Sequence, residues 1–567
     1  MSNTAITSPI QWERTDAPLL PLIPAAFWAD PAGLCAAAGK ELKRTAHHRD
    51  SCALPLADGA GALCVKHFIL STFGERLKWR LGLAAAQKEW RVLRFLHARR
   101  CAVPAPLACG WRRSAHGLDV WVVTEYIHDA VTFDQVRPMQ GVRDARLAAA
   151  ALAEVVAGIH AAGVWHGDLH SGNLLYVAAT NTWTITDFQS ARRGVPGRTE
   201  FVNDLVQLQH CLGKKVRLGI RVAFLRRYLA AFAELTGTVE EQSGEEWKSL
   251  FAEIRAKSRL YSIRQAQARS RRSERENRDF ARLERWIAPL ALPPEFEQGW
   301  VARHLSRQMI ADFLALVQDQ HWFLSSEITV LKNTRSVAVG VWAHPHGRLF
   351  IKQYRFRHLW RDRLFRLLHK SKAYRAWRRS WRLLHLHVNT PKPILVLWTP
   401  NGGFLVSEYI ADAVTSEAAF LRAQAEGSLA RRRMLIHAAA AELGHLHDRG
   451  VEHADLKASN VLVTRVDSAA PEILFTDVDA ARFYAHLPLS RRVRDLARLH
   501  AAFYPYLTNA ERRYFLRVYL KQLTEPVSLR ALIVAVEERA AGKIIAKHHL
   551  RPRGLSSRRA INNGNQL

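Results

Sequence analysis

Residues 164–173 place an aspartate, Asp168, five residues before an asparagine, Asn173, and follow a helix-like run that ends near His160. An aspartate in such a loop can accept or orient the proton of an attacking hydroxyl, and the asparagine can hold a magnesium ion on nucleotide phosphates. This spacing is typical of a phosphotransferase catalytic loop. Residues 451–460 repeat it with Asp455 and Asn460, so the sequence predicts two such sites.

Phosphoryl transfer depends on positioning and charge stabilisation, so a strand lysine, a helix glutamate and an acidic metal ligand are also expected. In the first half, Lys66 would hold the α and β phosphates and Glu89 would hold Lys66. Asp187 would join Asn173 as a ligand of magnesium. His166 is expected to brace the loop through hydrogen bonds.

Each of these residue types is common at positions without function, because strand lysines and helix glutamates are usually solvated. Their order and their repetition favour the functional interpretation. Lys352 and Asp477 follow Lys66 and Asp187 at a nearly constant separation. Glu125 and Glu408 stand in a repeated Glu-Tyr-Ile segment and are further candidates for nucleotide binding.

The pattern of strands and helices around these residues predicts an α+β fold with two tandem, bilobal, protein-kinase-like domains. Strand-like segments come first in the first half and helical segments later, which predicts a β-rich N-lobe and a helical C-lobe. The expected strands are 62–68, 120–127, 174–177 and 183–187, and the expected helices are 84–99 and 147–162.

The composition of the chain and the positions of its prolines set the expected domain limits. We assign 1–30 to an N-terminal extension, 31–285 to the first domain and 303–547 to the second. The proline-rich stretch in 286–302 is expected to be a stiff linker, and the basic tail 548–567 is expected to be disordered.

The charge balance indicates a polyanionic partner. The 567 residues include 82 Lys and Arg against 51 Asp and Glu, a net charge of +31, and 48% are hydrophobic, which excludes a disordered chain. An anionic membrane surface or a phosphorylated glycolipid would fit; nucleic acid fits less well because no nucleic-acid-binding motif is present. The six cysteines show no metal-ligand spacing, and neither a leader nor a membrane span is evident, which predicts a cytoplasmic protein.

Residues 352–382 combine twelve lysines and arginines with one aspartate and several interleaved aromatic residues. Two interpretations are equally favoured. The segment is either an amphipathic element for an anionic lipid interface or a helix whose aromatic side chains pack on its own domain.

The motifs resemble the lipopolysaccharide core kinases, which are distantly similar to protein kinases. The resemblance covers most of both halves and is carried by 64–68, 88–90, 103–106, 166–173, 186–192 and 204–205, and then by 350–354, 453–460, 477–482 and 494–496. It implies ATP and Mg²⁺ as cofactors and a sugar hydroxyl, of heptose or Kdo in the lipopolysaccharide inner core, as acceptor.

The sequence departs from the kinase pattern in three places. Neither half contains a glycine-rich phosphate loop, and Gln189 and Asp479 replace the glycine that usually follows the metal-binding aspartate. Aligning Trp377 with Trp90 puts Ala376 where Glu89 should be, so the second half lacks the partner of its lysine.

These observations predict a cytoplasmic kinase, peripheral at the inner membrane, whose first half is catalytic and whose second half is either a second catalyst or a degenerate partner domain. A small-molecule or protein kinase of the same fold and a tandem pseudokinase scaffold are the alternatives. Asp168 and Asp455 are the expected catalytic residues.

Overall fold

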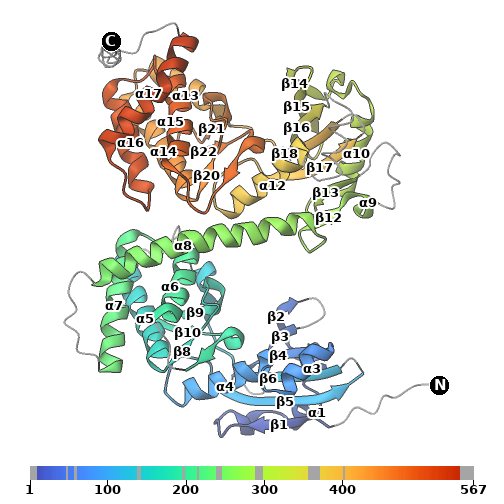
Figure 1. The fold of residues 1–567 in the computed structure, drawn as a ribbon. Coiled ribbons are helices and arrows are strands. Elements are labelled where there is room, and N and C mark those ends of the chain that lie inside the picture. Colours follow the sequence, from blue (N-terminus) through green and yellow to red (C-terminus); the bar gives the residue numbers. More distant parts are fainter. Residues whose placement is uncertain are drawn as a thin grey trace, which may run out of the picture. The chain divides into compact units, whose positions relative to one another are not determined.

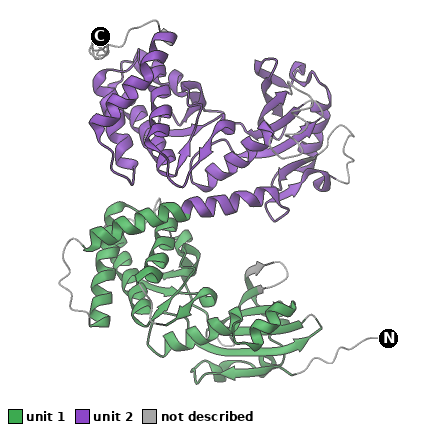
Figure 2. Ribbon diagram, viewed as in Figure 1, with its two compact units in different colours: residues 1–261 green, residues 262–567 purple. Residues whose placement is uncertain are grey.

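The computed structural model describes residues 9–45, 49–56, 61–115, 117–136, 142–194, 198–212, 216–237, 246–287, 298–355, 371–399 and 402–548. The chain divides into two compact units, Met1–Tyr261 and Ser262–Leu567 (Figure 2). The division falls inside helix α8 (Glu246–Ser270). Each unit has a strand-rich lobe followed by a helical lobe (Figure 1), so the predicted α+β, kinase-like organisation is confirmed.

The strand-rich lobe of the first unit is a six-stranded antiparallel sheet in the order β1-β5-β6-β4-β3-β2. Its strands are β1 (Gln11–Arg14), β2 (Lys40–Thr45), β3 (Arg49–Pro55), β4 (Ala62–Leu70), β5 (Pro106–Ser114) and β6 (Gly117–Glu125). Alternate side chains of β6 enter different cores, with Trp121 and Val123 on one face and Val120 and Val122 on the other. Both faces of the sheet are therefore covered.

Four helices belong to this lobe: α1 (Ala25–Ala29), α2 (Pro31–Ala38), α3 (Phe73–Arg80) and α4 (Ala85–His97). Buried Phe27 of α1 joins the core on one face of the sheet, and buried Trp90 of α4 joins the core on the other. Helix α4 carries Glu89 one residue before Trp90, so the packing of Trp90 directs that carboxylate toward the sheet.

The helical lobe of the first unit follows β6. It contains the helices α5 (Val142–Ala161), α6 (Arg198–Leu212) and α7 (Leu218–Thr236), the start of α8, and the short strands β7 (Ala130–Thr132), β8 (Val164–Trp165), β9 (Leu174–Val177), β10 (Thr182–Ile185) and β11 (Arg192–Arg193). The predicted hairpin is the β9–β10 pair. Buried Leu152 and Val156 of α5 pack in one cluster with Leu174 of β9, which fixes the hairpin beside the loop that precedes it.

The second unit repeats this plan. Its sheet has the order β12-β13-β17-β18-β16-β15-β14, so β16 lies between β18 and β15 as β4 lies between β6 and β3. The strands are β12 (Phe280–Arg282), β13 (Gln298–Ala302), β14 (Ile328–Asn333), β15 (Val337–His344), β16 (Gly347–Arg355), β17 (Pro393–Thr399) and β18 (Gly402–Glu408). The internal repeat of the sequence is thus a repeat of the fold.

The helices of the second unit also follow the first. They are α9 (Leu283–Trp286), α10 (Arg307–Gln318) and α12 (Lys372–His385) beside the sheet, and α13 (Ser416–Ala425), α14 (Leu429–Asp448), α15 (Leu489–Phe503), α16 (Asn509–Gln522) and α17 (Leu529–His548) in the helical lobe. The short strands there are β19 (Val414–Thr415), β20 (Val451–Glu452), β21 (Val461–Thr464), β22 (Glu472–Phe475) and β23 (Arg482–Phe483). No helix among the described residues is long and apolar enough to cross a membrane.

The limits of the units differ from the sequence-based limits at two places. Strand β1, from the expected N-terminal extension, pairs with β5. Strand β12, from the end of the expected first domain, and β13, from the expected linker, both belong to the sheet of the second unit. These short strands pair through the backbone, so composition did not reveal them. Residues 288–297 of the expected linker and 549–567 of the expected tail lie outside the described residues.

Candidate active sites

A buried carboxylate holds the start of the first catalytic loop. Asp204 of α6 is fully buried and accepts hydrogen bonds from the backbone N–H groups of His166 (2.5 Å) and Gly167 (2.8 Å). His160 contacts the same carboxylate at 3.3 Å. Gly167 has φ +74°, and a Cβ there would come within 2.8 Å of the Ser190 carbonyl oxygen, so this turn favours glycine.

The loop then presents Asp168 with its side chain about half exposed. The backbone carbonyl of Asp168 accepts a hydrogen bond from Asn173 Nδ2 at 3.0 Å, which fixes the two predicted residues relative to each other. His170 Nε2 lies 3.8 Å from Asp168 Oδ2. Asp168 is accessible to an incoming hydroxyl, while Asn173 is buried.

His166 connects this loop to the strand end that carries Asp187. Its Nε2 lies 2.9 Å from the Thr186 carbonyl oxygen. Burial lowers the pKa of His166 below its ordinary value, so the imidazole is neutral near pH 7. The side chain braces the loop, as the sequence indicated.

The nucleotide-binding candidates of the first unit lie together. Lys66 of β4 forms an ion pair with the buried carboxylate of Glu89, and its Nζ lies 3.8 Å from Asp187 Oδ1. Asp187 has a left-handed backbone (φ 69°) and accepts a hydrogen bond from Gln189 Nε2 at 2.7 Å. Glu125 ends β6, where the chain leaves the sheet for the helical lobe.

The donor set in this unit fits magnesium. The carboxylate of Asp187 and the amide oxygen of Asn173 are the hard oxygen ligands that this ion prefers, and Mg²⁺ commonly takes its remaining ligands from water and phosphate. Among the described residues, no group of three or more His, Cys, Asp or Glu side chains could hold a metal ion.

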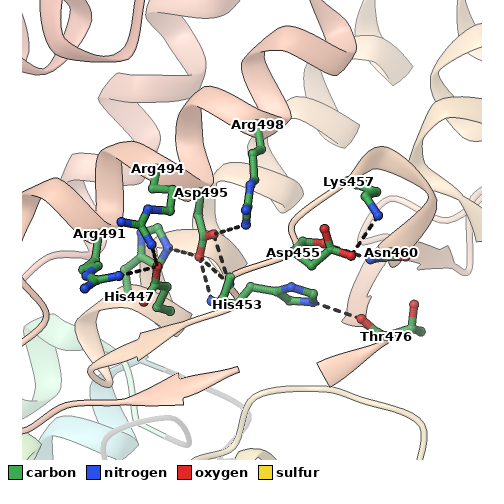
Figure 3. A network of polar contacts seen from close by, with 12 residues as sticks. His447, His453, Asp455, Lys457, Asn460, Thr476, Arg491, Arg494, Asp495 and Arg498 are labelled. Carbon is green, nitrogen blue, oxygen red and sulfur yellow. Dashed lines mark hydrogen bonds and ion pairs between the residues drawn. The ribbon is translucent and has the colours of Figure 1, made fainter. Parts of the chain in front are cut away.

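The second unit builds the same loop (Figure 3). Asp495 of α15 is fully buried and accepts hydrogen bonds from the N–H groups of His453 (2.6 Å) and Ala454 (3.1 Å). His453 Nε2 lies 3.0 Å from the Thr476 carbonyl oxygen. His447 lies 3.5 Å from Asp495, in the place that His160 takes beside Asp204.

Asp455, the candidate catalytic aspartate of the second unit, has a different neighbour from Asp168. Asn460 Nδ2 donates to the Asp455 carbonyl at 2.9 Å, as in the first unit. Lys457 Nζ donates to Asp455 Oδ2 at 2.8 Å, whereas the first unit has His170 at this position. The carboxylate of Asp455 is therefore already engaged by a cation.

The lysine of the second unit is paired differently from Lys66. Ala376, buried on α12, offers no carboxylate, and Lys352 Nζ instead donates directly to Asp477 Oδ1. Burial raises the pKa of Asp477, but the charge and hydrogen bond of Lys352 outweigh it and leave the pKa below its usual value. Ala376 thus supplies no partner for Lys352, which instead contacts the candidate metal ligand Asp477.

Asp479 interacts with this pair, whereas the candidate Glu408 contacts a different lysine. Burial and the adjacent Asp477 charge raise the pKa of Asp479. Glu408 ends β18 as Glu125 ends β6, and its carboxylate lies 3.6 Å from Lys392 Nζ.

The aromatic side chains of the described part of 352–382 pack inside the second unit. Tyr374 and Trp377 of α12 are buried in a cluster with Trp398 of β17, and Trp381 packs against it. This favours the packed-helix interpretation for α12. Residues 356–370 of the same segment lie outside the described residues.

Sequence reasoning left the two buried aspartates of the helical lobes without a function. Asp204 and Asp495 each precede a leucine in corresponding places of the two halves. That repetition was the available signal, but only the fold shows that each carboxylate accepts the backbone N–H groups of a catalytic loop.

Replacing Asp204 by alanine is expected to destabilise the first unit by about 2–4 kcal/mol, because the N–H groups of His166 and Gly167 and the buried His160 lose their acceptor. Denaturant unfolding of the full chain would show an earlier transition. Glu234→Ala, at an exposed carboxylate of α7, is the control and should leave the curve unchanged. Equal curves for Asp204→Ala and the control would contradict this prediction.

The fold and the paired lysine, aspartate and asparagine residues define a protein of the kinase-like class. A family model described as the lipopolysaccharide kinase (Kdo/WaaP) family matches residues 62–233 and 319–519, together more than half of the chain. The chain belongs to this family, and it is a kinase. No curated protein matches the sequence.

Among solved structures, one described as "WaaP in complex with acyl carrier protein" is similar at 20% sequence identity. The match covers 41% of this chain and 92% of that chain, with a TM-score of 0.31.

Proposed function

We propose that the first unit transfers the γ-phosphoryl group of ATP to a hydroxyl of a heptose or Kdo sugar in the lipopolysaccharide inner core. Family membership supports the reaction class, and the observation that carries the assignment to this unit is the Lys66–Glu89 ion pair beside Asp187.

Each side chain has a distinct part in this proposal. Glu89 orients the Lys66 ammonium toward the phosphates, and Asp168 accepts the proton of the sugar hydroxyl. Asn173 and Asp187 would hold Mg²⁺, which when bound neutralises charge on the phosphates. Asp204 is a positioning residue, because it acts through the backbone of the loop.

For the second unit, the same geometry supports a weaker nucleotide site and a partner-domain function. Lys352 is paired with Asp477 and Lys457 with Asp455, so two of the groups needed for transfer are already engaged. Binding of a magnesium nucleotide would have to break the first of these pairs.

We also place the acceptor at an anionic membrane surface on the cytoplasmic side of the inner membrane. The net charge of +31 supports a polyanionic partner, and a phosphorylated glycolipid in its bilayer provides one.

Mass spectrometry of the core oligosaccharide from a strain lacking this protein tests the proposal. We expect the loss of phosphate from a heptose or Kdo residue, restored by the parent chain and not by Asp168→Ala. An unchanged core would contradict the acceptor class.

A further inference from the structure

Helix α3 (Phe73–Arg80) presents apolar side chains to solvent. Its first turn is closed by a capping box between Thr72 and Glu75, so the helix is well defined. Four large apolar side chains on and just after it are exposed: Phe73 (74%), Leu77 (44%), Leu81 (63%) and Leu83 (52%). Such a gathering on one short segment is unusual for a surface that contacts only water.

The apolar residues form one stripe. Phe73, Leu77 and Leu81 follow one another at four-residue spacing, which places them on one face of the helix. Trp79 lies on the opposite face, where it packs against the sheet beside Trp111 with ring centroids 5.7 Å apart. The packing of Trp79 therefore turns the stripe outward.

Cations border the stripe. Arg76, Lys78 and Arg80 are all exposed, and the only acid of the helix, Glu75, is used in its N-terminal cap. An outward apolar stripe flanked by cations is complementary to an anionic lipid surface, where the apolar side chains enter the acyl boundary and the cations meet the headgroups.

The second half of the sequence repeats this composition at the corresponding place in the sequence. Residues 356–370 lie between β16, which carries Lys352, and α12, as α3 lies between β4 and α4. They contain the aromatic residues Phe356, Trp360 and Phe365 and the arginines Arg357, Arg361, Arg363 and Arg366. In both halves, a segment rich in apolar and basic residues therefore follows the strand that carries the candidate nucleotide-binding lysine.

We propose that α3 and the following Leu83 dock the first unit on an anionic bilayer. This inference rests on the proposed function, in which the acceptor is bound to a membrane. Insertion of Phe73, Leu77 and Leu81 would contribute a part of the membrane affinity that does not depend on salt. The three cations would contribute a part that weakens as salt rises. Docking by this helix would bring the lobe that carries Lys66 to the surface where a lipid-anchored acceptor lies.

Co-sedimentation of the full chain with vesicles tests it, using phosphatidylcholine alone and phosphatidylcholine with phosphatidylglycerol. The variant Phe73→Ser/Leu77→Ser/Leu81→Ser should bind the anionic vesicles at least about tenfold more weakly. The control Leu235→Ser/Leu324→Ser/Leu429→Ser removes leucines of similar exposure elsewhere and should bind as the parent does. Unfolding curves check that both variants fold.

A second variant, Arg76→Gln/Lys78→Gln/Arg80→Gln, should lose most of the preference for anionic vesicles and most of the salt dependence. If the parent does not sediment with anionic vesicles, or if the serine variant binds as tightly as the parent, the proposal is overturned and the stripe serves a protein partner or a second copy. The assay contains neither ATP nor acceptor, so its outcome is independent of the proposed reaction.

Discussion

The Asp168→Ala variant is expected to transfer phosphate at least about a hundredfold more slowly than the parent, with nucleotide binding largely kept. Asp168 is the half-exposed carboxylate of a loop that is otherwise fixed by Asp204 and Asn173. Removing its side chain takes away the proton acceptor and leaves the hydrogen bond from Asn173 to the backbone carbonyl in place. Turnover with saturating ATP and acceptor measures the effect, and titration with an ATP analogue measures binding.

Asp455→Ala is the matched variant in the second unit. Because Lys457 already engages the Asp455 carboxylate, this substitution should change total turnover by less than about twofold if transfer occurs in the first unit. A large loss of turnover with Asp455→Ala, together with little loss of turnover with Asp168→Ala, would assign the transfer reaction to the second unit instead.

The second large effect is expected on nucleotide affinity. Lys66→Met should weaken binding of a magnesium–ATP analogue to the tighter site of the full chain by about tenfold to a hundredfold, because a charge-assisted hydrogen bond to phosphate is lost. Lys352→Met should leave the tighter site unchanged, since Lys352 is paired with Asp477 and belongs to the weaker site. Calorimetric titration of the two full-length variants separates the sites.

Glu89→Ala offers a further comparison within the same experiment. This substitution places alanine at the position that corresponds to Ala376 of the second unit. Lys66 would then keep Asp187, 3.8 Å away, as an acidic neighbour. Affinity at the first site should then fall toward that of the second. Tighter binding at the second site in the parent chain would show that the Lys352–Asp477 pair does not hinder nucleotide.

Most of the fold could be predicted from the sequence, and so could the grouping of Lys66 with Glu89 and Asp187 and of Asp168 with Asn173. These residues stand in a fixed order, and the order recurs in the second half, so pattern alone brought them together. The family match confirms the class of enzyme that this pattern indicated.

Pairwise contacts were harder to predict. The absence of a carboxylate at Ala376 did not reveal that Lys352 pairs with Asp477, because the two residues lie 125 positions apart in the sequence. The short strands β12 and β13 join a sheet through backbone hydrogen bonds, which leave little trace in composition. The exposed stripe of α3 was missed because Trp79 decides which face of that helix is buried.

The central claim is that the first unit phosphorylates a sugar of the lipopolysaccharide inner core. The most direct measurement is mass spectrometry of dephosphorylated core acceptor after incubation with ATP, Mg²⁺ and the full chain, beside Asp168→Ala. We predict that the parent adds phosphate to a heptose or Kdo residue and that Asp168→Ala does not. An acceptor left unmodified by the parent, or modified equally by Asp168→Ala, would contradict this account.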